Sequence, residues 1–128
     1  MRTNYRRRNG LSVASAHRTT GTKGIDMAIT TGIVGAAGFA GIELTRLALR
    51  HPDLDLRVVT SNELAGTPVA AEYPGFTGAT DLAFATHDDP ALDACDLVFL
   101  AVPHTAALKM APQLVARGVT VVDLSADF

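Results

Sequence analysis

Residues 30–44 read Thr30-Thr31-Gly32-Ile33-Val34-Gly35-Ala36-Ala37-Gly38-Phe39-Ala40-Gly41-Ile42-Glu43-Leu44: an apolar segment, a glycine-rich turn and an amphipathic segment. The first glycine of the turn permits a tight bend, the second lets the backbone approach a ligand, and the third lets a helix pack closely on the strand. Exposed amides at the start of such a helix stabilise the negative charge of a pyrophosphate. The stretch therefore predicts a dinucleotide-binding loop, although its Gly-x-x-Gly-x-x-Gly spacing is also compatible with a plain turn and helix start. The candidate binding residues are Gly35, Ala36, Ala37, Gly38, Phe39, Ala40 and Gly41.

The composition indicates a single domain with its own core. The chain has 128 residues, of which 48% are hydrophobic, and it has no apolar run of about 18 residues or more that would predict a membrane span. We expect a cytoplasmic protein. Cys95 is the only cysteine, which excludes a disulfide within the chain and a zinc cluster. Its place at the start of an apolar run indicates a small buried residue rather than a nucleophile, so we expect no metal site.

The charge divides the chain at about residue 26. Residues 1–26 hold six basic residues and one acidic residue, whereas the remainder holds five basic and twelve acidic residues. The basic leader has no apolar periodicity and is predicted to be disordered. It is either an extension upstream of a natural start at Met27, which we favour, or a transit peptide. The acidic body, residues 27–128, argues against nucleic acid as a partner.

Strand and helix patterns alternate along the body. This alternation predicts an α/β fold with a doubly wound parallel sheet of the Rossmann type. The unbroken apolar run at 97–102 predicts a fully buried central strand, and Thr105 and Gly118 are expected to begin and end the helix that follows it. The expected strands are 28–34, 56–60, 82–85, 97–102 and 119–124, and the expected helices are 38–50 and 106–117, with short helical turns at 69–73 and 90–94.

Polar residues follow several of these strands, at the sheet edge where ligands of α/β proteins bind. A site for NAD carries a carboxylate about 20 residues beyond the glycines, but Ser61 and Asn62 stand there and only Glu63 follows. Since no acid at that position would repel a 2′-phosphate, the sequence favours NADP. Each residue also has a simpler role open to it, in a turn, a solvated loop or a cap. The candidate binding residues at this edge are Thr60, Ser61, Asn62, Pro103, His104 and Ser125.

Seven short motifs resemble the N-terminal part of the N-acetyl-gamma-glutamyl-phosphate reductases of arginine biosynthesis. The resemblance covers residues 28–128. The related aspartate-semialdehyde dehydrogenases share the glycine turn but differ after the fourth and fifth strands, so the last motifs favour the glutamyl-phosphate enzymes. The motifs are Gly-Ile-Val-Gly-Ala-Ala-Gly-Phe-Ala-Gly-Ile-Glu-Leu (32–44), His-Pro-Asp (51–53), Thr-Ser (60–61), Ala-Gly-Thr-Pro-Val (65–69), Asp-Leu-Val-Phe-Leu-Ala-Val-Pro-His (96–104), Ala-Pro (111–112) and Val-Val-Asp-Leu-Ser-Ala-Asp-Phe (121–128).

The resemblance implies an oxidoreductase that uses NADPH to convert N-acetyl-gamma-glutamyl phosphate to the semialdehyde. In that family a cysteine thiolate attacks the acyl phosphate, hydride from NADPH reduces the thioester, and a histidine serves as acid or base. The resemblance also implies a homo-oligomer when the protein is full length.

The chain departs from the family at two places. The family's Pro-Gly-Cys nucleophile lies beyond Phe128, so no catalytic residue is carried over. We therefore expect a truncated NAD(P)-binding domain that binds cofactor without turnover. Asn62 stands where the family often has a basic residue, which weakens a 2′-phosphate site. The alternative is a catalytically inactive nucleotide-binding module, or remnant, of a semialdehyde dehydrogenase.

Overall fold

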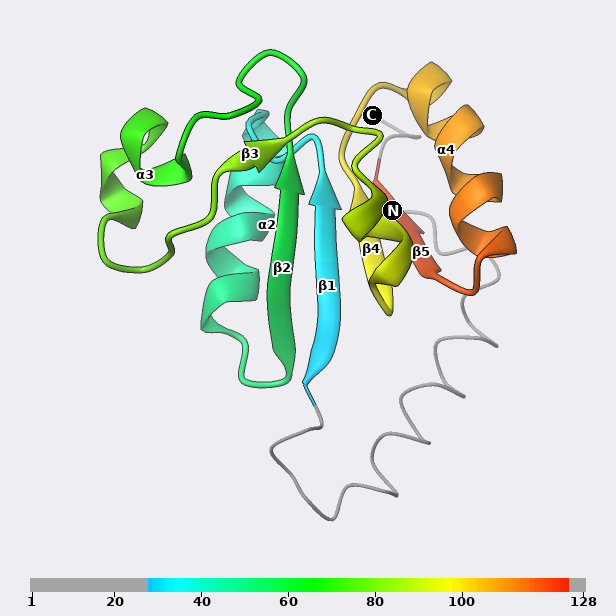
Figure 1. The fold of residues 1–128 in the computed structure, drawn as a ribbon, viewed down its shortest axis with the longest axis horizontal. Helices are drawn as coiled ribbons and strands as arrows, with labels where there is room; N and C mark the ends of the chain where they lie inside the picture. The colour runs from blue at the N-terminus through cyan, green and yellow to red at the C-terminus, as the bar shows by residue number, and fades with distance from the viewer. Residues whose placement is uncertain (1–27, 125–128) are drawn as a thin grey trace.

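The computed structural model describes residues 28–124, so the basic leader and Ser125 lie outside the described residues. Within them, five strands form one sheet with helices against it (Figure 1). The strands are β1 (Ile29–Val34), β2 (Leu54–Thr60), β3 (Phe84–Ala85), β4 (Leu97–Leu100) and β5 (Thr120–Asp123), and the helices are α2 (Phe39–Arg50), α3 (Val69–Glu72) and α4 (His104–Ala116), with short 3-10 helices η2 (Pro74–Phe76) and η3 (Pro90–Ala94).

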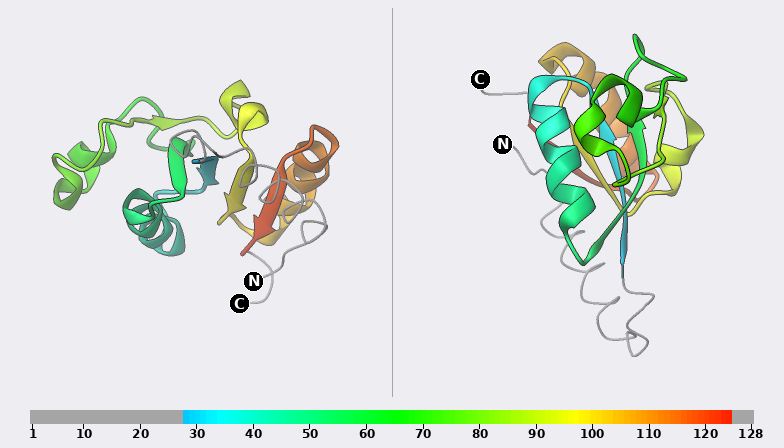
Figure 2. Two further views of the ribbon diagram at one scale, coloured as in Figure 1. Left: turned by 90° about the horizontal axis from the view of Figure 1, so that it is seen from below. Right: turned by 90° about the vertical axis from the view of Figure 1, so that its left-hand side faces the viewer.

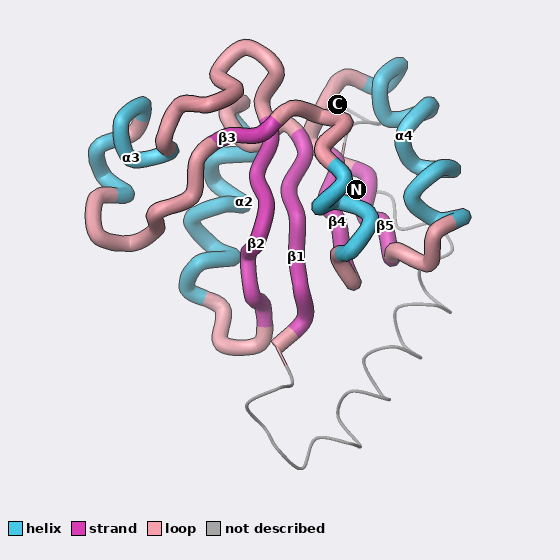
Figure 3. Tube along the Cα trace, viewed as in Figure 1, coloured by secondary structure: helices cyan, strands magenta, loops and turns pink. Residues whose placement is uncertain are grey.

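The sheet has the order β3-β2-β1-β4-β5, and all four strand pairs are parallel. The chain runs outward from β1 through β2 to β3, then returns to the other side of β1 for β4 and β5 (Figure 3). This reversal creates a switch point between β1 and β4, where ligands of doubly wound sheets bind. The predicted α/β fold with a doubly wound parallel sheet is confirmed.

Two hydrophobic clusters hold the helices on opposite faces of the sheet (Figure 2). On one face α2 contributes Ala48 to a cluster with Ile33 and Val59. On the other face α4 contributes Ala107 and Leu114 to a cluster that contains Val34, Val98 and Leu100. Because β1 supplies alternate residues to both clusters, its carboxyl end is fixed from both sides.

The strand predicted at 97–102 differs from β4 in length and burial. β4 ends at Leu100, and β1 rather than β4 occupies the centre of the sheet. Val98 and Leu100 are buried under α4, but Leu97 and Phe99 are only half-buried. An apolar run predicts burial on both faces, whereas α4 and its cluster cover only one face of this strand.

Helix α4 begins two residues before the predicted start. The carbonyl of Pro103 accepts hydrogen bonds from the amides of Ala106 (2.9 Å) and Ala107 (3.1 Å). Pro103 is therefore the N-cap residue, and Thr105 lies inside the first turn with no capping role. The prediction for Thr105 is wrong because the backbone of a proline can begin a helix without a capping side chain. The prediction that Gly118 ends this helix is confirmed by its positive φ of 90°.

Candidate functional site

An open cavity lies at the carboxyl edge of the sheet, beside the switch point between β1 and β4. Its volume of about 360 Å³ falls within the range of small-ligand pockets. Four loops meet there, one after each of β1, β2, β3 and β4. Six residues predicted from the sequence are therefore brought together with four that were not. The lining residues are Gly35, Ala37, Gly38, Ser61, Asn62, Glu63, His87, Ala101, Val102 and Pro103.

Gly35 makes the sharp turn that leaves β1. Its φ is +86°, and a Cβ there would lie 2.5 Å from the carbonyl oxygen of Ala101. Its amide and that of Ala36 both donate to the carbonyl of Thr60, at 3.1 and 2.8 Å. The turn is thus locked to the end of β2, and only glycine fits its conformation.

Gly41 brings α2 against the turn. It is buried, and a Cβ at this position would meet the Gly35 carbonyl and lie 2.8 Å from Cα of Ala36. The helix can therefore approach the strand closely only because no side chain stands between them. This contact matches the role predicted for the third glycine of the motif.

Gly38 leaves open space in front of the α2 N-terminus. As the N-cap residue it has an ordinary φ of −76°, and an added Cβ would come no closer than 3.6 Å, to the Gly35 carbonyl oxygen. The first hydrogen bond of the helix runs from Ile42 N to the Gly38 carbonyl. The first turn has no capping side chain and no acidic residue. Its free amides and the helix dipole can therefore receive an anion.

Tyr73 supports the turn from outside the glycine motif. Its hydroxyl donates to the Ala37 carbonyl over 2.7 Å, so the residue after α3 reaches across to fix the loop after β1. This contact was not predicted from the sequence. A tyrosine in a loop carries no local signal of a partner 36 residues earlier in the chain.

The end of β2 contributes three predicted residues with different surroundings. Thr60 is fully buried, and its hydroxyl lies 2.7 Å from Nδ1 of His87. The Ser61 hydroxyl accepts a hydrogen bond from the Leu64 amide (3.3 Å), so this residue both lines the cavity and closes a turn. Asn62 is exposed, and its Oδ1 accepts a hydrogen bond from the His87 amide (2.9 Å).

His87 is one of the four cavity residues that were not predicted from the sequence. It follows β3, whose carboxyl end lies on the same edge as those of β1, β2 and β4. Burial lowers the pKa of its imidazole below 6.5, and the nearby Asp88 carboxylate partly opposes this shift. The signal that could have found it was the edge rule itself, applied to the strand expected at 82–85 as it was to its neighbours.

The remaining predicted residues lie off the cavity wall or outside the described range. Phe39 is 95% exposed in the first turn of α2, and Ala40 beside it is also exposed. His104 is exposed at the first position of α4 and does not line the cavity. Ser125 lies outside the described residues.

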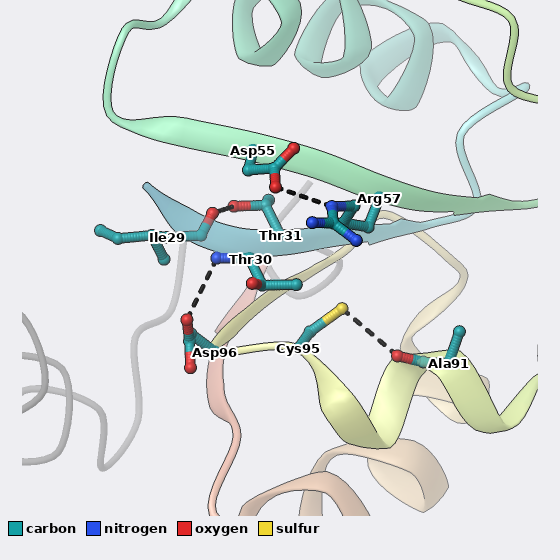
Figure 4. A network of polar contacts seen from close by, with 8 residues as sticks. All are labelled: Ile29, Thr30, Thr31, Asp55, Arg57, Ala91, Cys95 and Asp96. Carbon is teal, nitrogen blue, oxygen red and sulfur yellow. Dashed lines mark hydrogen bonds and ion pairs between the residues drawn. The ribbon is translucent and has the colours of Figure 1, made fainter. Parts of the chain in front are cut away.

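Cys95 lies at the amino end of β4, at the opposite edge of the sheet (Figure 4). Its side chain is buried, and its thiol donates to the Ala91 carbonyl over 3.5 Å. Burial, with a smaller contribution from Asp96, raises the pKa of the thiol to about 11, although Arg57 opposes this shift. The group is a thiol rather than a thiolate at neutral pH, as expected for a structural cysteine.

Residues 28–124 hold neither a candidate metal site nor a helix that could span a membrane. No three side chains of His, Cys, Asp or Glu in this range are grouped so that they could hold a metal ion. None of the helices in the same range has the length and apolar character required to cross a membrane.

Comparison with known proteins identifies the family. Residues 30–128 match the model of the semialdehyde dehydrogenase NAD binding domain. The chain is 51% identical over 100 residues to N-acetyl-gamma-glutamyl-phosphate reductases of Neisseria meningitidis and Acinetobacter baylyi. The match covers 78% of this chain and 29% of each relative, so the chain spans less than a third of their length. The resemblance inferred from the motifs is confirmed.

Solved structures of similar fold are aspartate semialdehyde dehydrogenases. The enzyme from Candida albicans, solved with NADP, has a TM-score of 0.65 at 21% identity. The match covers 77% of this chain and 30% of that enzyme's chain. A probable aspartate-semialdehyde dehydrogenase from Pseudomonas aeruginosa has a TM-score of 0.62 at 25% identity. That match covers 79% of this chain and 29% of the other chain. Fold and sequence thus agree, and this chain belongs to the semialdehyde dehydrogenase NAD-binding domain family.

Proposed function

We propose that this chain is the cofactor-binding part of an oxidoreductase that uses NADPH to reduce N-acetyl-gamma-glutamyl phosphate to its semialdehyde, a step of arginine biosynthesis. The names of the relatives support the substrate and the reaction. The family model supports a nicotinamide dinucleotide as the cofactor. The role of the described residues is to bind and orient that cofactor. They supply no thiolate nucleophile, because their one cysteine is buried and protonated.

The observation that carries the proposal is the uncapped N-terminus of α2 beside the cavity. The first-turn amides of Phe39, Ala40 and Gly41 precede the first helical hydrogen bond, and no side chain neutralises them within residues 28–124. Gly38 keeps the space in front of them open. A pyrophosphate fits this arrangement because its negative charge offsets both the free amides and the positive end of the helix dipole.

The other cavity residues divide between the two halves of a dinucleotide. The residues after β2, Ser61 and Asn62, stand where the adenosine ribose lies in doubly wound sheets. Pro103, after β4, forms the wall on the other side of the switch point. His104 and Ser125 remain predicted contacts of that second half. When bound, NADPH supplies the hydride for the reduction.

NADP rather than NAD is the finer part of the proposal. The residues Thr60, Ser61 and Asn62 at the end of β2 have no negative charge, so they do not repel a 2′-phosphate. Glu63 also lines the cavity, one position beyond the usual place of a carboxylate that binds the ribose. The cytoplasmic location and the homo-oligomer of a full-length reductase stay predictions.

The test is a fluorescence titration of the chain with NADPH, together with two glycine variants. Gly38→Ala places a methyl group in front of the α2 amides without a close contact inside the protein. It should weaken NADPH binding by about tenfold or more, about 1.4 kcal/mol in binding free energy. Gly75→Ala is the matched control, because its Cβ would meet nothing within 4 Å and the residue does not line the cavity.

Two results would contradict the proposal. One is no measurable binding of NADPH to the unaltered chain. The other is equal affinity of the unaltered chain and the Gly38→Ala variant, since the pyrophosphate would then not lie against this helix. Circular dichroism of both variants checks that the fold is unchanged.

A further inference from the structure

His87 occupies a defined place between β2 and the cavity. Its Nδ1 lies 2.7 Å from the hydroxyl of Thr60, and its amide donates to Oδ1 of Asn62 over 2.9 Å. These two residues end and follow β2, where the 2′ position of the adenosine ribose lies in doubly wound sheets. His87 lines this cavity and also the neighbouring one between η3 and α4, and within residues 28–124 its Nε2 has no hydrogen-bond partner.

The contact with Thr60 fixes the ring and leaves one nitrogen available. The Thr60 hydroxyl also accepts a hydrogen bond from the Gly35 amide (3.4 Å). Its oxygen therefore links the imidazole ring to the glycine turn. When Nδ1 accepts from the hydroxyl, Nε2 carries a proton and is a donor; when the imidazole is protonated, both nitrogens donate. In the protonated imidazole, the state that pairs with a phosphate, Nε2 is therefore the free donor of this side chain.

The cavity contains no arginine or lysine among its lining residues. Asn62 stands at the position after Ser61 where a cation would pair with a 2′-phosphate, and its side-chain oxygen is used to hold the His87 backbone. Of the lining residues, His87 is the only one whose side chain can become positively charged.

We propose that His87, held by Thr60 and Asn62, supplies the charge that recognises the 2′-phosphate of NADP, so that this residue sets the preference for NADP over NAD. The inference rests on the proposed binding of a nicotinamide dinucleotide. A residue of the loop after β3 would then pair with the 2′-phosphate in place of a basic residue after β2.

The surroundings of His87 predict the pH dependence of this preference. Burial lowers the pKa of the free imidazole below 6.5, whereas a phosphate dianion beside it raises that pKa. Binding of the phosphate therefore takes up a proton, and the preference for NADPH falls as the pH rises above the free pKa. The charged groups that face the ring or border the adjoining cavity between η3 and α4 are Glu63, Asp88, Asp89, Asp93 and Arg117.

The experiment measures the affinities of the full 128-residue chain for NADPH and NADH across neutral pH. We expect the ratio of the two affinities to fall by about three- to tenfold between about pH 6 and pH 8, as for a charged hydrogen bond at a partly exposed site. His87→Gln should lower the ratio at pH 6 and abolish its fall towards pH 8. His51→Gln is the matched control, because His51 lies at the C-terminal end of α2 and does not line the cavity.

A second measurement needs no variant protein. The His87 ring resonances, followed by NMR against pH, should titrate at higher pH with NADP+ than with NAD+. An equal titration with both, or an unchanged ratio in the His87→Gln variant, would overturn the assignment of His87 while cofactor binding itself stands. Failure of both dinucleotides to bind would overturn the proposed function together with this inference.

Discussion

Cys95 gives the clearest prediction at the scale of one residue. With its pKa raised from 9.0 to about 11 by burial and by Asp96, the thiolate fraction near pH 8 should be about 100-fold lower than in an unperturbed thiol. Folded protein should therefore react with a disulfide reagent at least that much more slowly than protein unfolded in urea. Equal rates in the two states would show that Cys95 is exposed or ionised in the native fold.

Individual residues also show where sequence reasoning succeeds and where it fails. Gly35 and Gly41 were identifiable because steric demands act over a few residues and leave a local pattern. The contacts of Tyr73 with Ala37 and of His87 with Thr60 join residues 36 and 27 positions apart. No spacing rule records such pairs, so these two contacts could be found only in the folded chain, although the edge rule could have pointed to His87 as a residue of the site.

At the scale of an element, the close packing of α2 on β1 predicts a large difference between two glycines of the same turn. In Gly41→Ala the new Cβ would collide with the Gly35 carbonyl and with Cα of Ala36. Because these are backbone atoms that must shift, the strain should lie near the upper end of about 1–3 kcal/mol and exceed the gain of about 1 kcal/mol in helix propensity. Urea denaturation should show a lower free energy of unfolding for Gly41→Ala.

The matched control for this element is Gly38→Ala. Its Cβ would make only an ordinary contact of 3.6 Å, so Gly38→Ala should lose only the preference of an N-cap position for glycine over alanine, about 1 kcal/mol or less. A Gly41→Ala protein as stable as this control would contradict the packing described for α2. The pair thus separates the glycine that the fold requires from the glycine that the cavity requires.

Elements as wholes were predicted better than their ends. Helix 38–50 agrees with α2 within one residue, because glycine precedes it and His51-Pro52 follows it. Helix α4 begins earlier than expected because hydrogen bonding starts at the Pro103 carbonyl. The burial of β4 was overestimated because apolar composition does not reveal which face a helix covers.

At the scale of the whole molecule, the parallel class of the sheet follows from the alternation of strands and helices. The order β3-β2-β1-β4-β5 does not, since strand neighbours depend on hydrogen bonds between distant segments. That order nevertheless explains the site, because it brings the loops after β1, β2, β3 and β4 to one cavity. The fold predicts a shared binding site for residues spread over nearly 70 positions of the sequence.

The most direct test of this account is the map of backbone amide chemical shifts, measured by NMR while NADPH is added to the chain. The largest changes should fall on residues 35–41, 61–63 and 87, which surround the cavity and the α2 N-terminus. The amide of Cys95, at the opposite edge of the sheet, should stay unchanged. Changes that gather elsewhere, or none at saturating NADPH, would contradict the assignment of this cavity as the dinucleotide site.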